Sequence, residues 1–241
     1  MSVLGLERLE VRHGQLQAVR GISLAVAEGE TLALVGANGA GKTTLLRAIA
    51  GAHRPAAGRI LLDGADVTAL PAYRRVAQGI ALVPEGRRLF AGMTVEENLL
   101  VARANGRPGP WTIERVLATF PMLRARFKAK AGSLSGGEQQ ATAIGRALVT
   151  NPRVLLLDEV SLGLAPIAVE RVYECLRALI GAGATIVLVE QDLGRALRVA
   201  TRVACMLEGR VVLEGAAAAM TREQVSAAYF GLARGEEPQP A

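Results

Sequence analysis

A glycine-rich segment at residues 36–43 has the residue types and the spacing of a phosphate-binding loop. It fits the pattern G-x-x-x-x-G-K-[ST] in full and stands between a predicted strand and a predicted helix. The main-chain N–H groups of such a loop converge on phosphate oxygens at a helix N-terminus. Lys42 adds a positive charge for the β- and γ-phosphates, and the Thr43 hydroxyl can ligate Mg²⁺. The residues expected to bind a nucleoside triphosphate here are Gly36, Ala37, Asn38, Gly39, Ala40, Gly41, Lys42, Thr43 and Thr44.

Two adjacent carboxylates, Asp158 and Glu159, end the aliphatic run 154–157. Such a run is typical of a parallel strand that is buried on both faces, and the carboxyl end of that strand opens onto the ligand crevice. We expect Asp158 to hold Mg²⁺, directly or through water, and Glu159 to polarise a water aimed at the γ-phosphate. The alternative is an acidic pair that caps the following helix.

A second glycine-containing motif opens the helix predicted after residue 134. Ser135 and Glu138 have the spacing of a capping box, and Gly136 and Gly137 lie between them. Two glycines leave the main chain uncovered, so an anion can approach the helix N-terminus there. Residues 134–138 read LSGGE.

Together with the phosphate loop and the Asp158–Glu159 pair, LSGGE resembles the signature sequence of the ABC-type ATPases, and the resemblance covers about residues 3–230. It implies an α/β fold of the P-loop NTPase type, with a RecA-like parallel core, an N-terminal antiparallel β-subdomain and an inserted helical subdomain. It implies ATP and Mg²⁺ as cofactors, with Lys42 and Glu159 among the catalytic residues. It also implies a head-to-tail dimer in which the signature residues of one subunit, Ser135, Gly136, Gly137 and Glu138, close over the γ-phosphate held by the other subunit.

Three positions depart from the general pattern of that family. Glu85 replaces a glutamine and can still bind Mg²⁺ through water. Gln191 replaces the switch histidine, so it can hydrogen-bond a γ-phosphate but cannot carry imidazolium charge. His13 stands where an aromatic residue stacks on adenine, and the alternative for His13 is an exposed histidine at a strand end.

The segments VPEGRRLF, MTVEENL and LVEQ together resemble the shorter ATPase subunit of branched-chain amino-acid importers. That resemblance implies a second ATPase subunit, two transmembrane permeases and, indirectly, a solute-binding protein as partners, with residues 85–97 facing the permease. The alternatives are a urea or amide importer, an exporter, or a soluble ABC ATPase acting on ribosomes or DNA. The last class usually has two ATPase units or a long coiled coil, and this chain has one phosphate loop and no heptad run.

The composition excludes other classes of protein. The chain has 241 residues, 51% of them hydrophobic, which excludes a disordered chain, and no apolar stretch reaches the length of a membrane span. Its formal charge of +6 comes from scattered arginines with few aromatic residues, so we expect no nucleic-acid partner. The first residues lack a signal-peptide pattern, so we expect a cytoplasmic chain. The resemblance to an importer subunit implies a peripheral position on the cytoplasmic face of the inner membrane. Cys175 and Cys205 are expected to be buried.

The pattern along the chain predicts one ABC ATPase domain at residues 1–234 and a disordered tail at 235–241. Within the domain, 1–84 and 146–234 form the α/β core with its β-subdomain, and 85–145 form a mostly helical subdomain. Strands are predicted at 22–26, 31–35, 59–63, 80–83, 154–157, 185–189, 203–207 and 210–213. Helices are predicted at 42–50 and 135–150, and another ends near 181–183.

Overall fold

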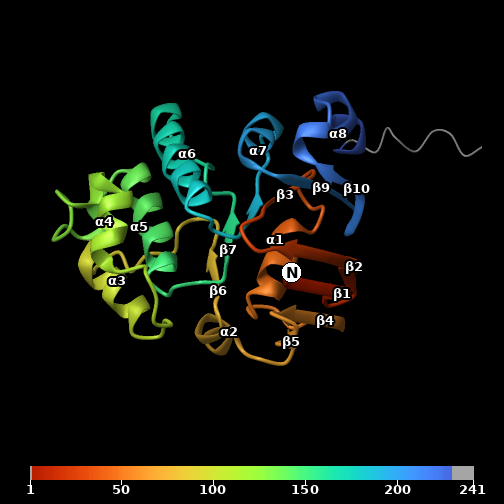
Figure 1. The fold of residues 1–241 in the computed structure, drawn as a ribbon, viewed down its shortest axis with the longest axis horizontal. Coiled ribbons are helices and arrows are strands. Elements are labelled where there is room, and N and C mark those ends of the chain that lie inside the picture. Colours follow the sequence, from red (N-terminus) through yellow and green to blue (C-terminus); the bar gives the residue numbers. More distant parts are fainter. Residues whose placement is uncertain (1, 230–241) are drawn as a thin grey trace, which may run out of the picture.

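The structure, a computed structural model, describes residues 2–229 of the chain and contains two sheets. The tail expected at 235–241 and the predicted domain end at 234 lie outside the described residues. The order of the antiparallel sheet is β2-β1-β4-β5, and that of the larger sheet is β10-β9-β3-β8-β7-β6. Helices α6, α7 and α8 lie on one side of the larger sheet, and the antiparallel sheet lies on the other side, with α1 between the two sheets (Figure 1).

The centre of the larger sheet is formed by three strands in which every residue is buried: β3 (Thr31–Val35), β7 (Val154–Asp158) and β8 (Ile186–Val189). These strands pair in parallel with one another, with β6 (Ile80–Val83) and with β9 (Arg202–Leu207). The prediction of parallel strands buried on both faces is confirmed. The strands predicted at 203–207 and 210–213 are confirmed, and they form a hairpin, because β10 (Arg210–Ala216) pairs antiparallel with β9 at the sheet edge.

Five helices cover this sheet. They are α1 (Lys42–Ile49), α5 (Gly136–Leu148), α6 (Pro166–Gly181), α7 (Leu193–Val199) and α8 (Arg222–Tyr229). The apolar side of α1 packs into the core between the two sheets, whereas α5 and α6 pack on the opposite face of β7 and β8. Gly51 follows α1 with a positive φ of 76°, a conformation that glycine commonly adopts just after a helix C-terminus. Both cysteines are free and buried, as expected.

The antiparallel sheet is longer than the sequence predicted. Its strands are β1 (Ser2–His13), β2 (Leu16–Ala27), β4 (Ala57–Leu62) and β5 (Ala65–Asp66). β1 was not assigned bounds in advance, and β2 begins six residues before the predicted start at residue 22. The reason is that exposed and polar residues interrupt the apolar run of β2, although its main chain stays paired with β1 as far as Leu16.

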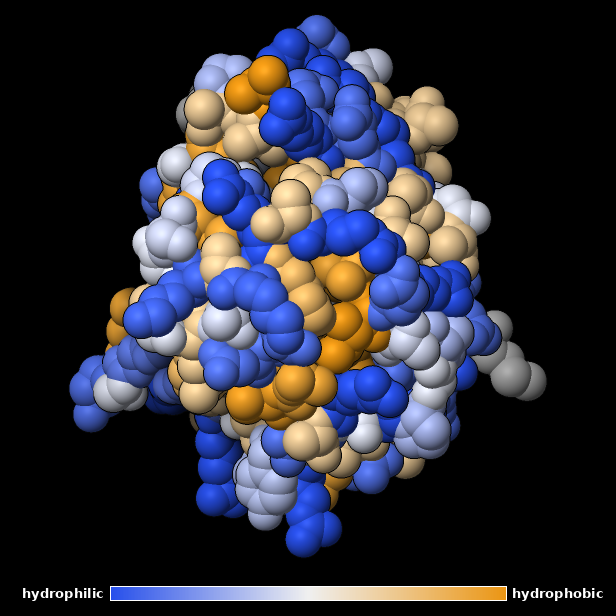
Figure 2. Space-filling view, turned by 90° about the vertical axis from the view of Figure 1, so that its left-hand side faces the viewer, coloured by the Kyte–Doolittle hydropathy of each residue, from blue (hydrophilic) through white to orange (hydrophobic). Residues whose placement is uncertain are grey.

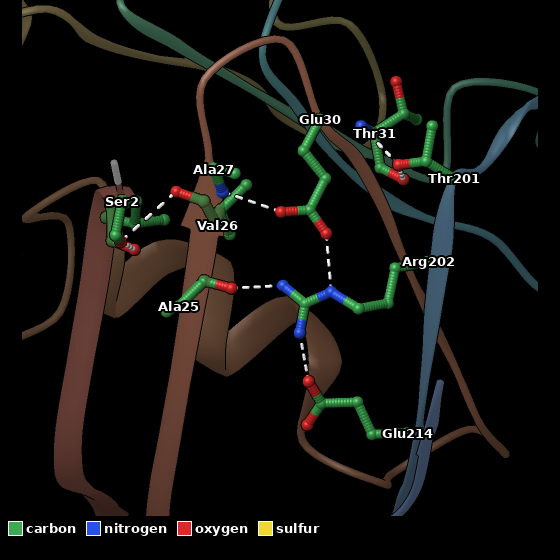
Figure 3. Close-up of polar contacts among 10 residues, drawn as sticks. Ser2, Ala25, Val26, Ala27, Glu30, Thr31, Thr201, Arg202 and Glu214 are labelled. Carbon is green, nitrogen blue, oxygen red and sulfur yellow. Dashed lines mark hydrogen bonds and ion pairs between the residues drawn. The ribbon is translucent and has the colours of Figure 1, made fainter. Parts of the chain in front are cut away.

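Arg202, the first residue of β9, joins the two sheets (Figure 3). Its guanidinium donates to Glu30 Oε1 at 2.5 Å, and it also bonds to Glu214 of β10 and to the main-chain oxygen of Ala25 in β2. Glu30 Oε2 in turn accepts from the Ala27 N–H at 2.6 Å. The arginine and its acidic partners therefore hold the end of β2 against β9 and β10, on the side of the core that supports the antiparallel sheet.

The inserted segment lies at one end of the molecule (Figure 1). It contains α3 (Val95–Arg103), α4 (Ile113–Thr119) and two short 3₁₀ turns. A capping box begins α3, because the Thr94 side chain accepts from the Glu97 N–H and the Glu97 carboxylate accepts from the Thr94 N–H at 2.7 Å. Turns, bends and irregular main chain occupy 104–112 between the two helices, where two prolines lack N–H donors.

Two further features were not predicted. Helix α2 (Ala72–Gln78) precedes β6. Helix α5 continues through the predicted boundary at 145 and 146, so its N-terminus lies with the insert while its C-terminal end reaches the core. Among residues 2–229, no helix is both long enough and apolar enough to cross a membrane.

Candidate nucleotide-binding site

The glycine-rich loop connects β3 to the N-terminus of α1, as predicted, and two of its glycines are required by the local geometry. Gly36 and Gly41 have φ values of 151° and 99°. A Cβ atom would overlap the Met206 carbonyl oxygen at Gly36 and the Ala18 carbonyl oxygen at Gly41. The loop therefore turns tightly against β9 and β2, and its main-chain groups stay accessible at the start of α1.

Lys42 lies inside this loop. Its side chain is only 4% exposed, and Nζ donates to the main-chain oxygens of Gly36 at 2.7 Å and Ala37 at 3.0 Å. Burial lowers the pKa of Lys42, while the carboxylates of Glu159 and Asp158 act in the opposite direction. The ammonium is therefore held at the centre of the loop, where an incoming phosphate would exchange with two main-chain acceptors.

A cavity of about 510 Å³ opens above the loop and collects most of the predicted site residues. Its lining comes from the loop and α1, from the β1–β2 turn, and from the segments that follow β6, β7 and β8. The lining residues are His13, Leu16, Ala18, Asn38, Gly39, Gly41, Lys42, Thr43, Thr44, Glu85, Glu159, Leu162 and Gln191. Segments that are far apart in the sequence thus meet because the carboxyl ends of the parallel strands lie at one edge of the sheet.

Asp158, the last residue of β7, faces Thr43, which lines this cavity. The carboxylate is 1% exposed, and Oδ1 accepts from the Thr43 hydroxyl at 2.9 Å. Oδ2 is buried without a hydrogen-bond partner within the described part of the chain. Desolvation raises the pKa of Asp158, and the bond from Thr43 partly opposes that change. A buried carboxylate oxygen that lacks a donor, next to a hydroxyl, is a ligand set that fits Mg²⁺.

Glu159 and Gln191 are in direct contact. Gln191 Nε2 donates to Glu159 Oε2 at 2.6 Å. Glu159 has a left-handed main chain with φ 48°, and its N–H donates to the Val189 carbonyl oxygen at 3.1 Å. The turn after β7 therefore directs the Glu159 carboxylate toward the segment that follows the neighbouring strand β8, which ends at Val189, two residues before Gln191. Sequence spacing did not reveal this pair, because its members are 32 residues apart.

His13 lies at the end of β1, on the rim of the cavity. Its Nε2 is hydrogen-bonded to the Thr44 hydroxyl at 3.1 Å, which connects the ring to α1. The ring also packs against His53, with 4.5 Å between centroids and a tilt of 58°. His53 was not singled out from the sequence, although the two histidines are the only ones in the chain.

The signature residues 135–138 are not brought to this cavity. They form the N-terminus of α5, where the predicted capping box is confirmed. Together with residues 163–165 and the start of α6, they line a separate cavity of about 380 Å³. A Cβ on Gly136 would lie 3.0 Å from Leu164 Cδ2, and one on Gly137 would lie 3.0 Å from Ala168 Cβ. Each glycine therefore allows close packing, and the two glycine-containing motifs line different cavities of one chain.

Sequence reasoning also missed Glu190, which is 2% exposed and directly precedes Gln191. A glutamate that ends an apolar strand was the only available signal, and it does not reveal the partners that surround the side chain.

Comparison with known proteins agrees with this geometry. The model of the family described as ABC transporter matches residues 19–161. The high-affinity branched-chain amino acid transport ATP-binding protein BraG of Pseudomonas aeruginosa is 41% identical over 95% of this chain and 100% of its own length. The Nod factor export ATP-binding protein I of Burkholderia pseudomallei is 39% identical over 90% of this chain and 72% of its own length.

Among solved structures, an ATP-binding cassette in a dimeric post-hydrolysis state with bound ADP and Pi is similar, with a TM-score of 0.77 and 26% identity. The similarity covers 89% of this chain and 98% of that cassette. The chain therefore belongs to the ABC transporter family, of which it is an ATP-hydrolysing subunit. The predicted fold class is confirmed.

Proposed function

We propose that this protein energises the uptake of branched-chain amino acids by hydrolysing ATP beneath a membrane importer. The observation that supports hydrolysis most directly is the arrangement of Glu159 and Gln191 at the mouth of the phosphate loop, in contact at 2.6 Å. Support for the solute comes from the similarity to BraG, which extends over the whole length of that protein.

In the proposed reaction, Glu159 acts as the general base for a water that attacks the γ-phosphate. Its carboxylate lines the cavity that contains Lys42, at the carboxyl end of β7. Gln191 orients Glu159 and donates to the γ-phosphate when ATP is bound. Lys42 then leaves its two main-chain acceptors and neutralises the β- and γ-phosphates.

We assign Mg²⁺ to Thr43, Asp158 and Glu85. Thr43 and Asp158 are already paired at 2.9 Å, and Asp158 Oδ2 has no donor within residues 2–229. Glu85 follows β6 and lines the same cavity. Held by these residues, the ion would neutralise negative charge that develops on the phosphates in the reaction.

We place the adenine base against His13. The ring is on the cavity rim, it is fixed by Thr44 at 3.1 Å, and His53 packs against it. Exposed Leu16 lines the same end of the cavity and adds apolar surface for the base.

The γ-phosphate site needs a second ATPase subunit in this proposal. The signature residues 135–138 line a cavity other than the one that contains the phosphate loop. A head-to-tail dimer would bring the α5 N-terminus of one subunit over the phosphate loop of the other. The similar cassette bound to ADP and Pi is dimeric, which supports this arrangement.

A groove of about 480 Å³ between α2, α3 and α5 is the surface that we assign to the permease. It is lined by exposed Tyr73 and Phe90, and the Arg146 guanidinium lies 5.7 Å from the centre of the Phe90 ring. Figure 2 shows hydrophobic residues gathered among hydrophilic ones on the side of the molecule that carries α3 and α4. Two permeases and a solute-binding protein would complete the importer, with this chain on the cytoplasmic face of the membrane.

The test of hydrolysis is Glu159→Gln, with Glu174→Gln on the exposed side of α6 as the matched control. Loss of a general base lowers kcat by about 100-fold or more, whereas ATP binding should stay close to that of the wild type. Near-normal turnover by Glu159→Gln would remove Glu159 as the base.

The solute is tested separately in vesicles that contain the complete transporter. ATP-dependent accumulation of labelled leucine or valine, abolished by Glu159→Gln, is the expected result. Accumulation of urea instead, or ATP-dependent efflux, would assign the subunit to one of the other transporter classes. Binding to ribosomes without any membrane partner would exclude transport altogether.

A further inference from the structure

Glu190 is a buried carboxylate that joins three parts of the chain. It follows β8 directly and is 2% exposed. Its Oε2 accepts from the Tyr173 hydroxyl of α6 at 2.5 Å and from the Ser161 hydroxyl at 2.9 Å. Its Oε1 accepts from the N–H groups of Gln191 at 3.0 Å and Asp192 at 3.1 Å. Both oxygens are therefore occupied by donors from the turn after β7, from α6 and from the turn after β8.

These bonds surround the proposed hydrolytic pair. Ser161 lies two residues after Glu159, and Gln191 carries the amide that donates to Glu159. The Glu190 carboxylate thus holds the turn after Glu159 through the Ser161 hydroxyl, and it holds the turn of Gln191 through main-chain N–H groups. The Arg195 guanidinium, at the start of α7, donates to the Ser161 hydroxyl at 3.3 Å and supports the same arrangement from the solvent side.

We propose that Glu190 is a positioning residue for ATP hydrolysis, which holds the turns after β7 and β8 so that Gln191 stays in contact with Glu159. The proposal rests on the hydrolytic roles assigned above to Glu159 and Gln191. Glu190 does not line the nucleotide cavity, so it acts through Gln191 and not on ATP.

The chemistry of the donors explains why a carboxylate is needed at this position. The N–H groups of Gln191 and Asp192 are fixed donors to Glu190, and the Tyr173 and Ser161 hydroxyls donate to it as well. An ionised carboxylate offers acceptor positions on both oxygens, whereas a glutamine would present an NH₂ group to one pair of donors. If the NH₂ group faces the N–H groups of Gln191 and Asp192, both of those bonds are lost and the turn of Gln191 is released. If it faces the two hydroxyls instead, they must rotate to accept from it, and all the bonds lose the added strength that an ionised acceptor gives.

The experiment compares Glu190→Gln, Gln191→Ala and the double variant in steady-state ATPase assays of the assembled transporter. For Glu190→Gln we expect kcat to fall about tenfold or more while the KM for ATP stays within about twofold, since the phosphate loop is untouched. In the Gln191→Ala background the same change should cost less than about twofold, because the two residues act as one unit.

Asn151→Asp is the matched control. Asn151 is a half-buried side chain outside the cavity that also joins several segments, with bonds to Trp111 N at 2.7 Å and Arg107 O at 3.1 Å. Its replacement exchanges an amide for a carboxylate and should lower the melting temperature without changing kcat. If Glu190→Gln fails to fold, Ser161→Ala is the second variant. It removes one of the same hydrogen bonds with a smaller change of side chain, and it should still lower kcat by a larger factor than it changes the KM for ATP.

The outcomes separate the two levels of the proposal. Wild-type turnover by Gln191→Ala would refute the role assigned to Gln191, and the role of Glu190 with it. A low kcat for Gln191→Ala together with normal kcat for Glu190→Gln would overturn only the positioning role. If the effects of Glu190→Gln and Gln191→Ala on kcat are fully additive, the positioning role is also overturned, because a purely structural residue weakens the site independently of Gln191.

Discussion

Arg75 on α2 should contribute strongly to stability although it has no acidic partner in direct contact within the described chain. Its side chain is 1% exposed, and the guanidinium donates to four main-chain oxygens. Two of them, Ala48 at 2.6 Å and Ile49 at 2.8 Å, are at the C-terminal end of α1. The other two, Thr68 at 2.7 Å and Leu70 at 2.9 Å, belong to the loop before α2. We therefore expect Arg75→Met to destabilise the protein.

The magnitude follows from the acceptors that lose their donor. The Ala48 oxygen also accepts from the Gly51 N–H, so it keeps one partner. The oxygens of Ile49, Thr68 and Leu70 would be left without one, at a cost of about 1–3 kcal/mol each. Burial of the guanidinium lowers the pKa of Arg75, which reflects the cost of removing its charge from water. Because Arg75→Met removes that cost, the expected loss of stability lies near the lower end of that sum, about 3–5 kcal/mol. For a domain of this size that loss lowers Tm by about 6–20 °C.

The assay is unfolding by urea, followed by circular dichroism in the absence of nucleotide. Arg74→Met is the matched control, because Arg74 is exposed on the same helix and only lies over the Tyr73 ring at 5.9 Å. Arg75→Lys keeps the charge but loses the forked donor geometry, so it should fall between Arg75→Met and the wild type. If Arg75→Met is no less stable than Arg74→Met, the hydrogen bonds to α1 and the loop do not support the fold as argued.

Two predictions concern nucleotide binding. Lys42→Ala should weaken ATP binding by about 100-fold, since it removes the buried charge that faces the phosphates, and unchanged affinity in calorimetry would refute the phosphate-loop assignment. His13→Ala should weaken ATP binding about fivefold or more, and His13→Tyr should restore or exceed wild-type affinity, because a larger ring stacks over more of the base. Equal affinities for all three proteins would place the adenine elsewhere.

The sequence predicted those parts of the site whose structure depends on a short, continuous run of residues. The position of the glycine-rich loop between β3 and α1 was predicted correctly because its glycines are required by positive φ values and by contacts with the Met206 and Ala18 carbonyls, which few other sequences would satisfy. Strand β7 was predicted because an uninterrupted aliphatic run can be accommodated only between two layers. Its terminal Asp158 then lies at the sheet edge by topology alone.

Contacts between distant segments could not be predicted in the same way. The bond from Gln191 to Glu159 depends on β8 lying beside β7 and on the left-handed conformation of Glu159, neither of which has a local pattern. The packing of His53 against His13 depends on the chain returning after α1 to pair with β1. The start of β2 was missed because pairing with β1, not apolar alternation, holds its first residues in the sheet.

The capping box at the start of α5 bears directly on the proposed dimer. Glu138 accepts from the Ser135 N–H at 2.8 Å and pairs with Arg126 at 3.2 Å. Burial acts to raise the pKa of Glu138, but the bonds from Ser135 and Arg126 outweigh it and lower that pKa. The negative charge at this helix N-terminus is therefore stabilised by neighbours in the same chain, and the N–H groups of Gly136 and Gly137 take no part in the box. An incoming phosphate can use those two donors without displacing Glu138, which is what a signature motif serving a second subunit's nucleotide requires.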